Sequence, residues 1–214
     1  MDQSGLFDLN SQPDQGETLQ LGDAALVDFP TAFDRETSQA LFDRLYQDIP
    51  WRQESLWIGG KRREVPRLQC WMGDTASLYG YSGMRLQPVA WHSTVLEIRR
   101  RAEELSQCSF NSVLLNLYRD GLDSVAWHAD DEAELGDDPV IASVSLGADR
   151  PFQLKSRQSQ PPEKHQIWLK NGSILVMGKG IQSRWLHQLP KVKSLKKARI
   201  NLTFRQVQKL NAQA

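Results

Sequence analysis

Apolar and polar residues alternate along several short stretches in the second half of the chain. The stretch 198–207 is the clearest case, because Ile200, Leu202 and Phe204 are apolar while the residues between them are polar. A period of two residues is typical of a β-strand with one buried face. The same criterion predicts further strands at Val113–Tyr118, Ser124–His128, Ile141–Leu146, Phe152–Lys155, Gln166–Leu169 and Ser173–Met177.

The first half of the chain shows a different pattern. We predict one strand at Leu21–Phe29 and two helices, at Asp34–Asp48 and Val89–Ser106, whose apolar residues recur at helical spacing. The strands Trp51–Ile58 and Val65–Trp71 flank a Gly-Gly pair that favours a tight hairpin turn. Helices followed by many short strands predict a mostly β (α+β) fold, namely a double-stranded β-helix, or jelly roll. The N-terminal helices would then pack on one of its sheets.

A length of 214 residues suits one domain with a substantial core. The polar, acidic stretch 1–20 is expected to be a disordered tail. We expect one domain over 21–214, with an N-terminal extension at 21–110 and a jelly-roll core at 111–207. We found no internal repeat and no long linker within it.

Composition narrows the possible partners. The formal net charge is zero, which argues against binding to nucleic acid through bulk electrostatics, so any such contact must use local patches. The apolar runs are too short to span a membrane, and the N-terminus lacks the pattern of a secretory signal. Cys70 and Cys108 have no metal-ligand spacing and suit a reducing cytoplasm. We therefore expect a cytoplasmic protein, monomeric and without a membrane partner.

Three residues suggest a metal site. His128 and Asp130 are two positions apart, so in a strand both side chains point to one face. With His187 from another element, they would form the two-histidine, one-carboxylate set of non-haem Fe(II) oxygenases. The alternative for the His-x-Asp triplet alone is a pair of surface polar residues beside a strand.

The polar face of the stretch 198–207 strengthens the metal interpretation. It carries Arg199, Thr203 and Arg205, while Asn116 and Tyr118 share a face on an earlier predicted strand. Arginine forms bidentate, charge-assisted hydrogen bonds with carboxylates. A pocket that combines iron with arginine suggests 2-oxoglutarate, whose keto-acid end chelates the metal and whose distal carboxylate needs a cation. We expect Arg205 to pair with that carboxylate. The role of Arg199, beside Asp130 or beside the substrate, is left open.

Five motifs occur in the order found in one enzyme family. They are Asn116–Tyr118, His128–Glu132, Ile141–Gly147, His187–Pro190 and Arg199–Arg205. Together they resemble the AlkB family of Fe(II)/2-oxoglutarate-dependent dioxygenases, over about 65–205. Val65–Arg67 and Tyr79–Gly83 add a similarity to the branch of the human-type homologues.

The resemblance implies a function and roles for residues. Members of the family oxidise the N-methyl group of alkylated bases such as 1-methyladenine and 3-methylcytosine, using Fe(II), 2-oxoglutarate and O2 and releasing formaldehyde, which repairs DNA alkylation damage. The expected iron ligands and catalytic residues are His128, Asp130 and His187. The residues expected to hold 2-oxoglutarate are Asn116, Tyr118, Arg199, Thr203 and Arg205. The residues expected to surround the base are Tyr79, Tyr81, Asp131 and Glu132.

Two further features concern the nucleic acid. Basic residues form two candidate groups of phosphate contacts, which are Lys61, Arg62, Arg63 and Arg67, and Lys191, Lys193, Lys196 and Lys197. The hairpin tip has Gly59-Gly60 where some relatives that act on duplexes place an aromatic, so we expect a preference for single-stranded DNA unless Ile58 replaces that aromatic. RNA is a further candidate substrate.

Other functions are compatible with parts of the pattern. An oxygenase acting on a protein or a small molecule would have the same iron and arginine residues but no need of the base-site residues. A non-enzymatic metal-binding jelly roll, or a zinc hydrolase, would not need the predicted keto-acid pocket.

Overall fold

The structure is a computed structural model that describes residues 15–74, 79–81, 84–86 and 88–208. For Ile58 and for residues 79–81 and 84–86 it describes the backbone alone. None of the described helices is long and apolar enough to cross a membrane.

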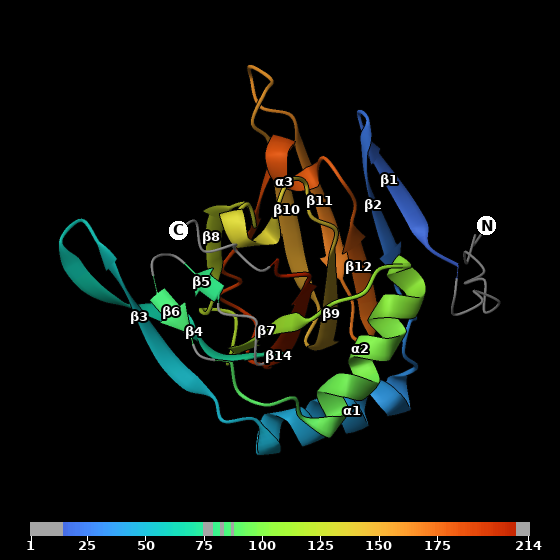
Figure 1. The fold of residues 1–214 in the computed structure, drawn as a ribbon, viewed down its shortest axis with the longest axis vertical. Helices are drawn as coiled ribbons and strands as arrows, with labels where there is room; N and C mark the ends of the chain where they lie inside the picture. Colours follow the sequence, from blue (N-terminus) through green and yellow to red (C-terminus); the bar gives the residue numbers. More distant parts are fainter. Residues whose placement is uncertain (1–14, 75–78, 82–83, 87, 209–214) are drawn as a thin grey trace, which may run out of the picture.

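Two antiparallel sheets face each other and form the jelly roll predicted from the sequence (Figure 1). The major sheet has eight strands, in the order β1 (Glu17–Leu21), β2 (Ala24–Phe29), β12 (Ser173–Met177), β9 (Ile141–Gly147), β14 (Arg199–Arg205), β7 (Ser112–Tyr118), β4 (Lys61–Gly73) and β3 (Arg52–Ile58). The minor sheet has four strands, in the order β11 (Lys164–Leu169), β10 (Arg150–Ser156), β13 (Trp185–Leu189) and β8 (Val125–His128). The remaining elements are the small hairpin of β5 (Tyr79–Tyr81) and β6 (Met84–Leu86), the 3-10 helix η1 (Ala133–Leu135) and the short helix α3 (Ile181–Arg184).

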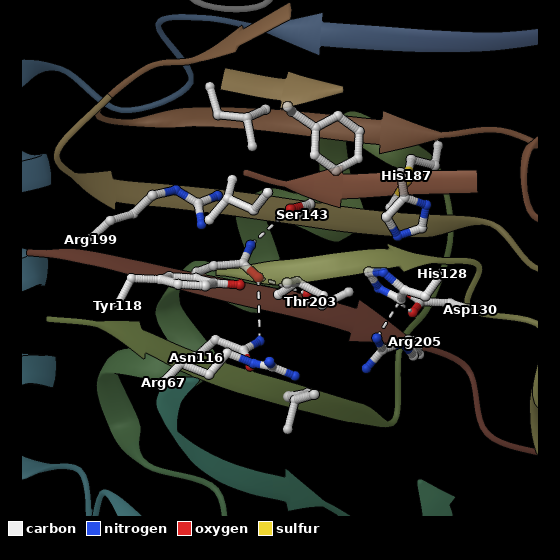
Figure 2. Close-up of a pocket in the computed structure, with 17 residues that line it drawn as sticks. Arg67, Asn116, Tyr118, His128, Asp130, Ser143, His187, Arg199, Thr203 and Arg205 are labelled. Carbon is white, nitrogen blue, oxygen red and sulfur yellow. Dashed lines mark hydrogen bonds and ion pairs between the residues drawn. The ribbon is translucent and has the colours of Figure 1, made fainter. Parts of the chain in front are cut away.

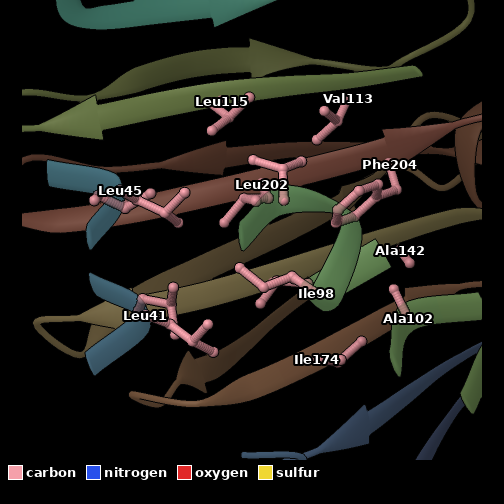
Figure 3. Packing of buried hydrophobic residues seen from close by; sticks show 14 of the residues in the cluster. Leu41, Leu45, Ile98, Ala102, Val113, Leu115, Ala142, Ile174, Leu202 and Phe204 are labelled. Carbon is pink, nitrogen blue, oxygen red and sulfur yellow. The ribbon is translucent and has the colours of Figure 1, made fainter. Parts of the chain in front are cut away.

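Two long helices, α1 (Arg35–Asp48) and α2 (Ser93–Ser106), cover the outer face of the major sheet. Asp34 caps α1 by accepting a hydrogen bond from the backbone N–H of Thr37, and the His92 side chain caps α2. Between helices and sheet lies an apolar core, shown in Figure 3, that includes Leu41, Leu45, Ile98, Val113, Leu115, Leu202 and Phe204. Each such side chain, when fully buried, stabilises the fold by about 1.5–3 kcal/mol.

The alternation along β14 separates this core from a polar interior. Ile200, Leu202 and Phe204 face the helices, while Arg199 and Arg205 lie buried on the opposite side, toward the minor sheet. Since side chains alternate across a strand, one short sequence supplies both the core and a polar lining. The space between the two sheets therefore holds charged and amide groups beside a second apolar cluster.

The structure corrects several predicted boundaries. The predicted strand Leu21–Phe29 is two strands joined at Gly22, where φ is +70°. The first of them starts at Glu17, within the stretch expected as a tail, and residues 1–14 of that stretch lie outside the described residues. Helix α2 begins at Ser93 rather than Val89, because the backbone of Val89 bonds to that of Trp71. Strand β13 was not predicted.

Candidate metal centre and co-substrate pocket

His128, Asp130 and His187 meet between the two sheets (Figure 2). One ligand atom from each residue can be chosen so that all of them lie within 4.8 Å of one another. His187 lies on β13 directly opposite His128 on β8, and Asp130 follows β8 by two residues. The pairing of two strands of the minor sheet thus brings together residues that are distant in the sequence, as the metal hypothesis required.

Both histidines present ring nitrogens suited to a metal. His128 Nδ1 lies 2.9 Å from the backbone oxygen of Ala126, so its Nε2 is the atom turned toward Asp130, at 3.6 Å from Oδ1. Burial, together with the nearby charge of His128, lowers the pKa of His187 to about 3. His187 is therefore neutral at physiological pH, which is the form that binds metals.

Asp130 has one oxygen engaged and one available. Its Oδ2 accepts a hydrogen bond from Arg205 Nη2 at 2.9 Å, and its buried Oδ1 has no hydrogen-bond partner among the described residues. Burial by itself would raise the pKa of Asp130, but the charge of the Arg205 guanidinium and its hydrogen bond outweigh this effect and hold the pKa well below its usual range. A buried, ionised oxygen without a hydrogen-bond partner, beside two imidazole rings, fits a divalent cation.

A second group of contacts orients the metal ligands. The side-chain oxygen of Gln182, on α3, accepts a hydrogen bond from the backbone N–H of Asp130 at 3.0 Å. The ring of Phe152, on β10, lies 5.3 Å from that of His187 between centroids. Groups of this kind fix the direction of a ligand and tune its affinity.

A pocket extends from the metal ligands along the inner face of the major sheet (Figure 2). Its polar lining comes from β4, β7, β9 and β14 and consists of Arg67, Asn116, Tyr118, Ser143, Arg199, Asn201, Thr203 and Arg205. Hydrogen bonds link many of these groups. Thr203 Oγ1 donates to Asn201 Oδ1 at 2.9 Å, and Asn201 Nδ2 donates to Ser143 Oγ at 2.8 Å. The lining is thereby held in one arrangement.

Arg199 and Arg205 occupy different parts of this pocket. Arg205 is at the metal end, bonded to Asp130, whereas Arg199 donates to Ser145 Oγ at 2.8 Å and lies over the Tyr118 ring, 5.3 Å from its centroid. Burial lowers the pKa of Arg199 to about 10, so it keeps its charge at neutral pH. The Arg205 guanidinium is engaged by the metal-ligand carboxylate, which does not favour the predicted pairing of Arg205 with the distal carboxylate of 2-oxoglutarate. Arg199 is the cation away from the metal.

All five residues predicted to hold 2-oxoglutarate line this one pocket. Sequence reasoning missed Ser143, which shares the wall, and Ser145, which supports Arg199. The signal was present, because polar Ser143 and Ser145 alternate with apolar residues along β9 as Thr203 and Arg205 do along β14.

The residues predicted around the base are less completely placed. Asp131 is exposed at the surface, and its carboxylate accepts a hydrogen bond from Arg157 Nη1 at 3.0 Å. The next residue, Glu132, is partly buried. The side chains of Tyr79 and Tyr81 lie outside the described residues.

One predicted phosphate contact is wrong. Arg67 is buried, and its Nε donates to Asn116 Oδ1 at 2.8 Å, so it forms part of the pocket wall instead of the surface. The other candidates are exposed, and they are Lys61, Arg62, Arg63, Lys191, Lys193, Lys196 and Lys197. The predicted turn is confirmed, since Gly59 and Gly60 have positive φ angles of 58° and 74°.

Comparison with known proteins agrees with this geometry. Residues 25–205 match the family model of the 2OG-Fe(II) oxygenase superfamily. The chain is 34% identical to human alpha-ketoglutarate-dependent dioxygenase alkB homolog 3, over 97% of this chain and 72% of that protein. It is 38% identical to the bovine form over 83% of this chain, and the aligned part is 64% of the bovine protein, less than two thirds of its length.

Two further proteins extend the comparison. Mouse DNA oxidative demethylase ALKBH2 is 34% identical over 84% of this chain and 79% of its own length. The solved structure of OsALKBH1 superposes with a TM-score of 0.61 at 15% identity, covering 89% of this chain and all of that chain, which supports the fold alone. From its family model, its relatives and its ligand set, the chain belongs to the AlkB family of Fe(II)- and 2-oxoglutarate-dependent dioxygenases.

Proposed function

We propose that this enzyme removes methyl groups from alkylated nucleic-acid bases of the 1-methyladenine and 3-methylcytosine type, and that it acts in repair of DNA alkylation damage. The observation that carries the proposal is the buried His-Asp-His set at one end of an arginine-lined pocket. The relatives named as DNA oxidative demethylases support the choice of DNA as substrate. With O2, bound Fe(II) and 2-oxoglutarate would supply the oxidation that hydroxylates the methyl carbon, while 2-oxoglutarate is converted to succinate and CO2. The hydroxymethyl group then leaves as formaldehyde, and the unmodified base remains in the strand.

Within this proposal, His128, Asp130 and His187 hold the iron. Arg205 keeps the Asp130 carboxylate ionised and fixes its orientation through the 2.9 Å hydrogen bond to Oδ2. That bond leaves Oδ1 directed toward the histidines. The protein's part in the chemistry is to orient these groups in a buried, water-poor site.

2-Oxoglutarate would lie along the inner face of β7 and β14. Arg199, at the end of the pocket away from the metal, would pair with the distal carboxylate, and Tyr118 would lie beside it. Asn116 and Thr203 line the wall between the two ends. Their side-chain amide and hydroxyl are already bonded within the network that includes Asn201, so the wall is preorganised before 2-oxoglutarate enters.

Asp131 and Glu132 would select a cationic methylated base, with Tyr79 and Tyr81 as the aromatic contacts. In the structure Asp131 is paired with a cation already, the Arg157 guanidinium. A positively charged base would take the place of that guanidinium, whereas a neutral base could not.

We further propose a preference for single strands over duplexes. The tip of the hairpin between β3 and β4 has two glycines, so no side chain there fills the gap left by a flipped base, and unstacking costs a few kcal/mol. Trp57, with 75% of its surface exposed, is a large apolar side chain near the tip. Repair of one lesion with and without the complementary strand, at fixed salt, tests this preference. Faster repair of the duplex would contradict it and direct attention to Trp57 and Ile58.

Several other properties belong to the same proposal. The free thiols of Cys70 and Cys108 suit the cytoplasm, where we place the enzyme as a monomer. RNA is a second candidate substrate. The domain arrangement that we propose has residues 21–110 as an extension of the jelly-roll core at 111–207, although β2, from the first segment, pairs with β12, from the second.

The deciding experiment measures formaldehyde and repaired base together. The enzyme is loaded anaerobically with Fe(II), and 2-oxoglutarate is added with oligonucleotides that carry 1-methyladenine, 3-methylcytosine or no lesion. We expect both products from the lesioned strands alone. Turnover of 2-oxoglutarate without base repair would instead favour an oxygenase that acts on a protein or a small molecule.

A further inference from the structure

The outer face of the minor sheet is a polar and aromatic surface with no role in the site described above. Its central row crosses three strands, with Gln166 on β11 opposite Gln153 on β10, and Gln153 opposite Gln188 on β13. The three amides form a chain, in which Gln188 Nε2 donates to Gln153 Oε1 at 2.7 Å and Gln153 Nε2 donates to Gln166 Oε1 at 2.9 Å. The row is therefore an ordered polar strip across the sheet.

Two tryptophans border this strip. Trp168, on β11, has 50% of its surface exposed and stands two residues from Gln166 on the same face. Trp127, on β8, lines a hollow together with Gln153, Gln188, Lys164 and Gln166. Trp127 is partly buried, whereas Trp168 offers an exposed aromatic ring beside amide groups, on which a planar ring can stack and form hydrogen bonds.

Lysines form a parallel row next to the glutamines. Lys155 lies opposite Lys164 in the register of β10 and β11, two residues and about 6.5 Å along each strand from Gln153 and Gln166. Lys155 Nζ also lies 4.6 Å from the centroid of the Trp127 ring. Among the described residues neither lysine forms an ion pair, since Glu163 pairs with His165 and Asp149 with Lys170. The positive charge of this row is thus available to an anion.

We propose that this surface, formed by Trp127, Gln153, Lys155, Lys164, Gln166, Trp168 and Gln188, binds single-stranded nucleic acid at a second, non-catalytic site. Bases would stack on Trp168 along the glutamine row, and phosphates would contact the adjacent lysine row, in which Lys155 lies over the Trp127 ring. A four-stranded antiparallel sheet with aromatics on its open face is a geometry that binds single strands, and base stacking on aromatics does not depend on sequence. Charge separates this occupant from a neutral polymer such as a carbohydrate, which would not need the lysines.

The position of the surface gives it a use. The residues that flank the metal ligands in sequence, Trp127 and Gln188, belong to the outer face, while His128 and His187 point inward. Strand β8 forms one edge of the minor sheet. A single-stranded nucleic acid that crosses the outer face to this edge would therefore reach the element that carries His128. The surface would hold undamaged nucleic acid near the site and raise the local concentration of lesions.

The test measures binding of the full chain to a fluorescently labelled oligothymidylate of about 15 nucleotides without a lesion. Trp168→Ala should raise the Kd about 5- to 150-fold, since stacking of a base on an aromatic is worth about 1–3 kcal/mol. The double variant Lys155→Ala/Lys164→Ala should reduce the slope of log Kd against log salt by about 1.4, because two phosphate contacts are lost. Neither measurement needs iron or 2-oxoglutarate. The binding result can therefore be interpreted even if the demethylase proposal fails.

Matched controls lie on α1, which packs on the far side of the major sheet (Figure 1). Tyr46→Ala removes an aromatic that is 49% exposed, and Arg35→Ala removes an exposed cation. Both should leave the Kd within about twofold. Photo-crosslinking with 4-thiothymidine should label the segment 164–170. The proposal is overturned if Trp168→Ala binds like the unmodified chain, or if it weakens binding of heparin, which has no bases, as much as binding of the oligonucleotide.

Discussion

Arg205 and Asp130, 75 positions apart in the sequence, form a buried ion pair in which Nη2 lies 2.9 Å from Oδ2. Each side chain is 3% exposed. Such a pair is costly to break from one side, because removing one partner leaves the other charge buried without compensation. Here the pair also fixes which carboxylate oxygen faces His128 and His187.

The first prediction concerns the metal. Replacing His187 by Ala should remove the bound Fe(II) and abolish turnover of 2-oxoglutarate, because it deletes one of three protein ligands. The fold should persist, since the substitution leaves the strand pairing of β13 with β10 unchanged. Metal content and circular dichroism are the measurements. His165→Ala is the control and should keep its iron. A His187→Ala variant with stoichiometric iron and normal turnover would refute the ligand assignment.

Replacing each of the two buried arginines, Arg199 and Arg205, should impair a different property of the enzyme. Arg199→Ala should raise the 2-oxoglutarate concentration needed for half-maximal turnover by about 10-fold or more, because a charge-assisted hydrogen bond is worth about 1.5–3 kcal/mol. Arg205→Ala should instead weaken metal retention by about 10- to 100-fold, as expected for a residue that supports a ligand.

Both variants are assayed for the 2-oxoglutarate requirement and for iron retained after dialysis, so each serves as the control for the other. Arg199→Lys, which keeps the charge and loses the planar fork, should show an intermediate requirement. The reverse pattern, with Arg205 governing 2-oxoglutarate and Arg199 governing iron, would contradict the assignment.

Asp131 tests the base site. Asp131→Asn keeps the shape but removes the charge, so turnover on 3-methylcytosine should fall about 10-fold while the requirement for 2-oxoglutarate stays the same. Arg157→Ala is the matched control, because it breaks the same 3.0 Å ion pair but leaves the carboxylate in place. Equal losses in both variants, or an equal loss on a neutral lesion, would show that Asp131 acts through local structure.

Asp28 should make stability depend on pH. Burial, aided by the nearby charge of Glu17, raises the pKa of this carboxyl to about 6, and its Oδ1 has no partner among the described residues. The folded state therefore holds a proton more tightly than the unfolded chain, whose carboxyl has its ordinary pKa near 4. The contribution of Asp28 to stability is most favourable below that value and is lost as the pH rises through about 6.

It follows that Asp28→Asn should stabilise the protein at pH 7. We expect the free energy of unfolding to rise by about 1–2 kcal/mol. This is less than the full free energy that corresponds to the pKa shift, because the Asp28 side chain is only partly buried. Urea denaturation at pH 7 and at pH 4 measures it, and the difference between variant and parent should nearly vanish at the lower pH. An equal gain at both values would mean that ionisation of Asp28 is not the cause.

Local pattern by itself determined much of this protein. The alternation along 199–205 identified β14, its apolar face and its polar face, because side-chain direction in a strand depends only on position along it. The same rule placed His128 and Asp130 together, and the glycine pair at 59–60 fixed the hairpin turn. The family motifs in the sequence also indicated iron and 2-oxoglutarate, without knowledge of any contact between side chains.

Tertiary structure decided what depends on partners distant in the sequence. Nothing local shows that Arg205 faces Asp130 and that Arg199 lies over Tyr118, because both assignments come from the pairing of β14 between β7 and β9 and from the approach of the minor sheet. In the sequence, Arg67 resembles the other cations of a basic run. Only the structure shows that it is buried and donates a hydrogen bond to Asn116. Strand β13 is defined by its pairing with β10 and β8, and that pairing brings His187 to the metal site.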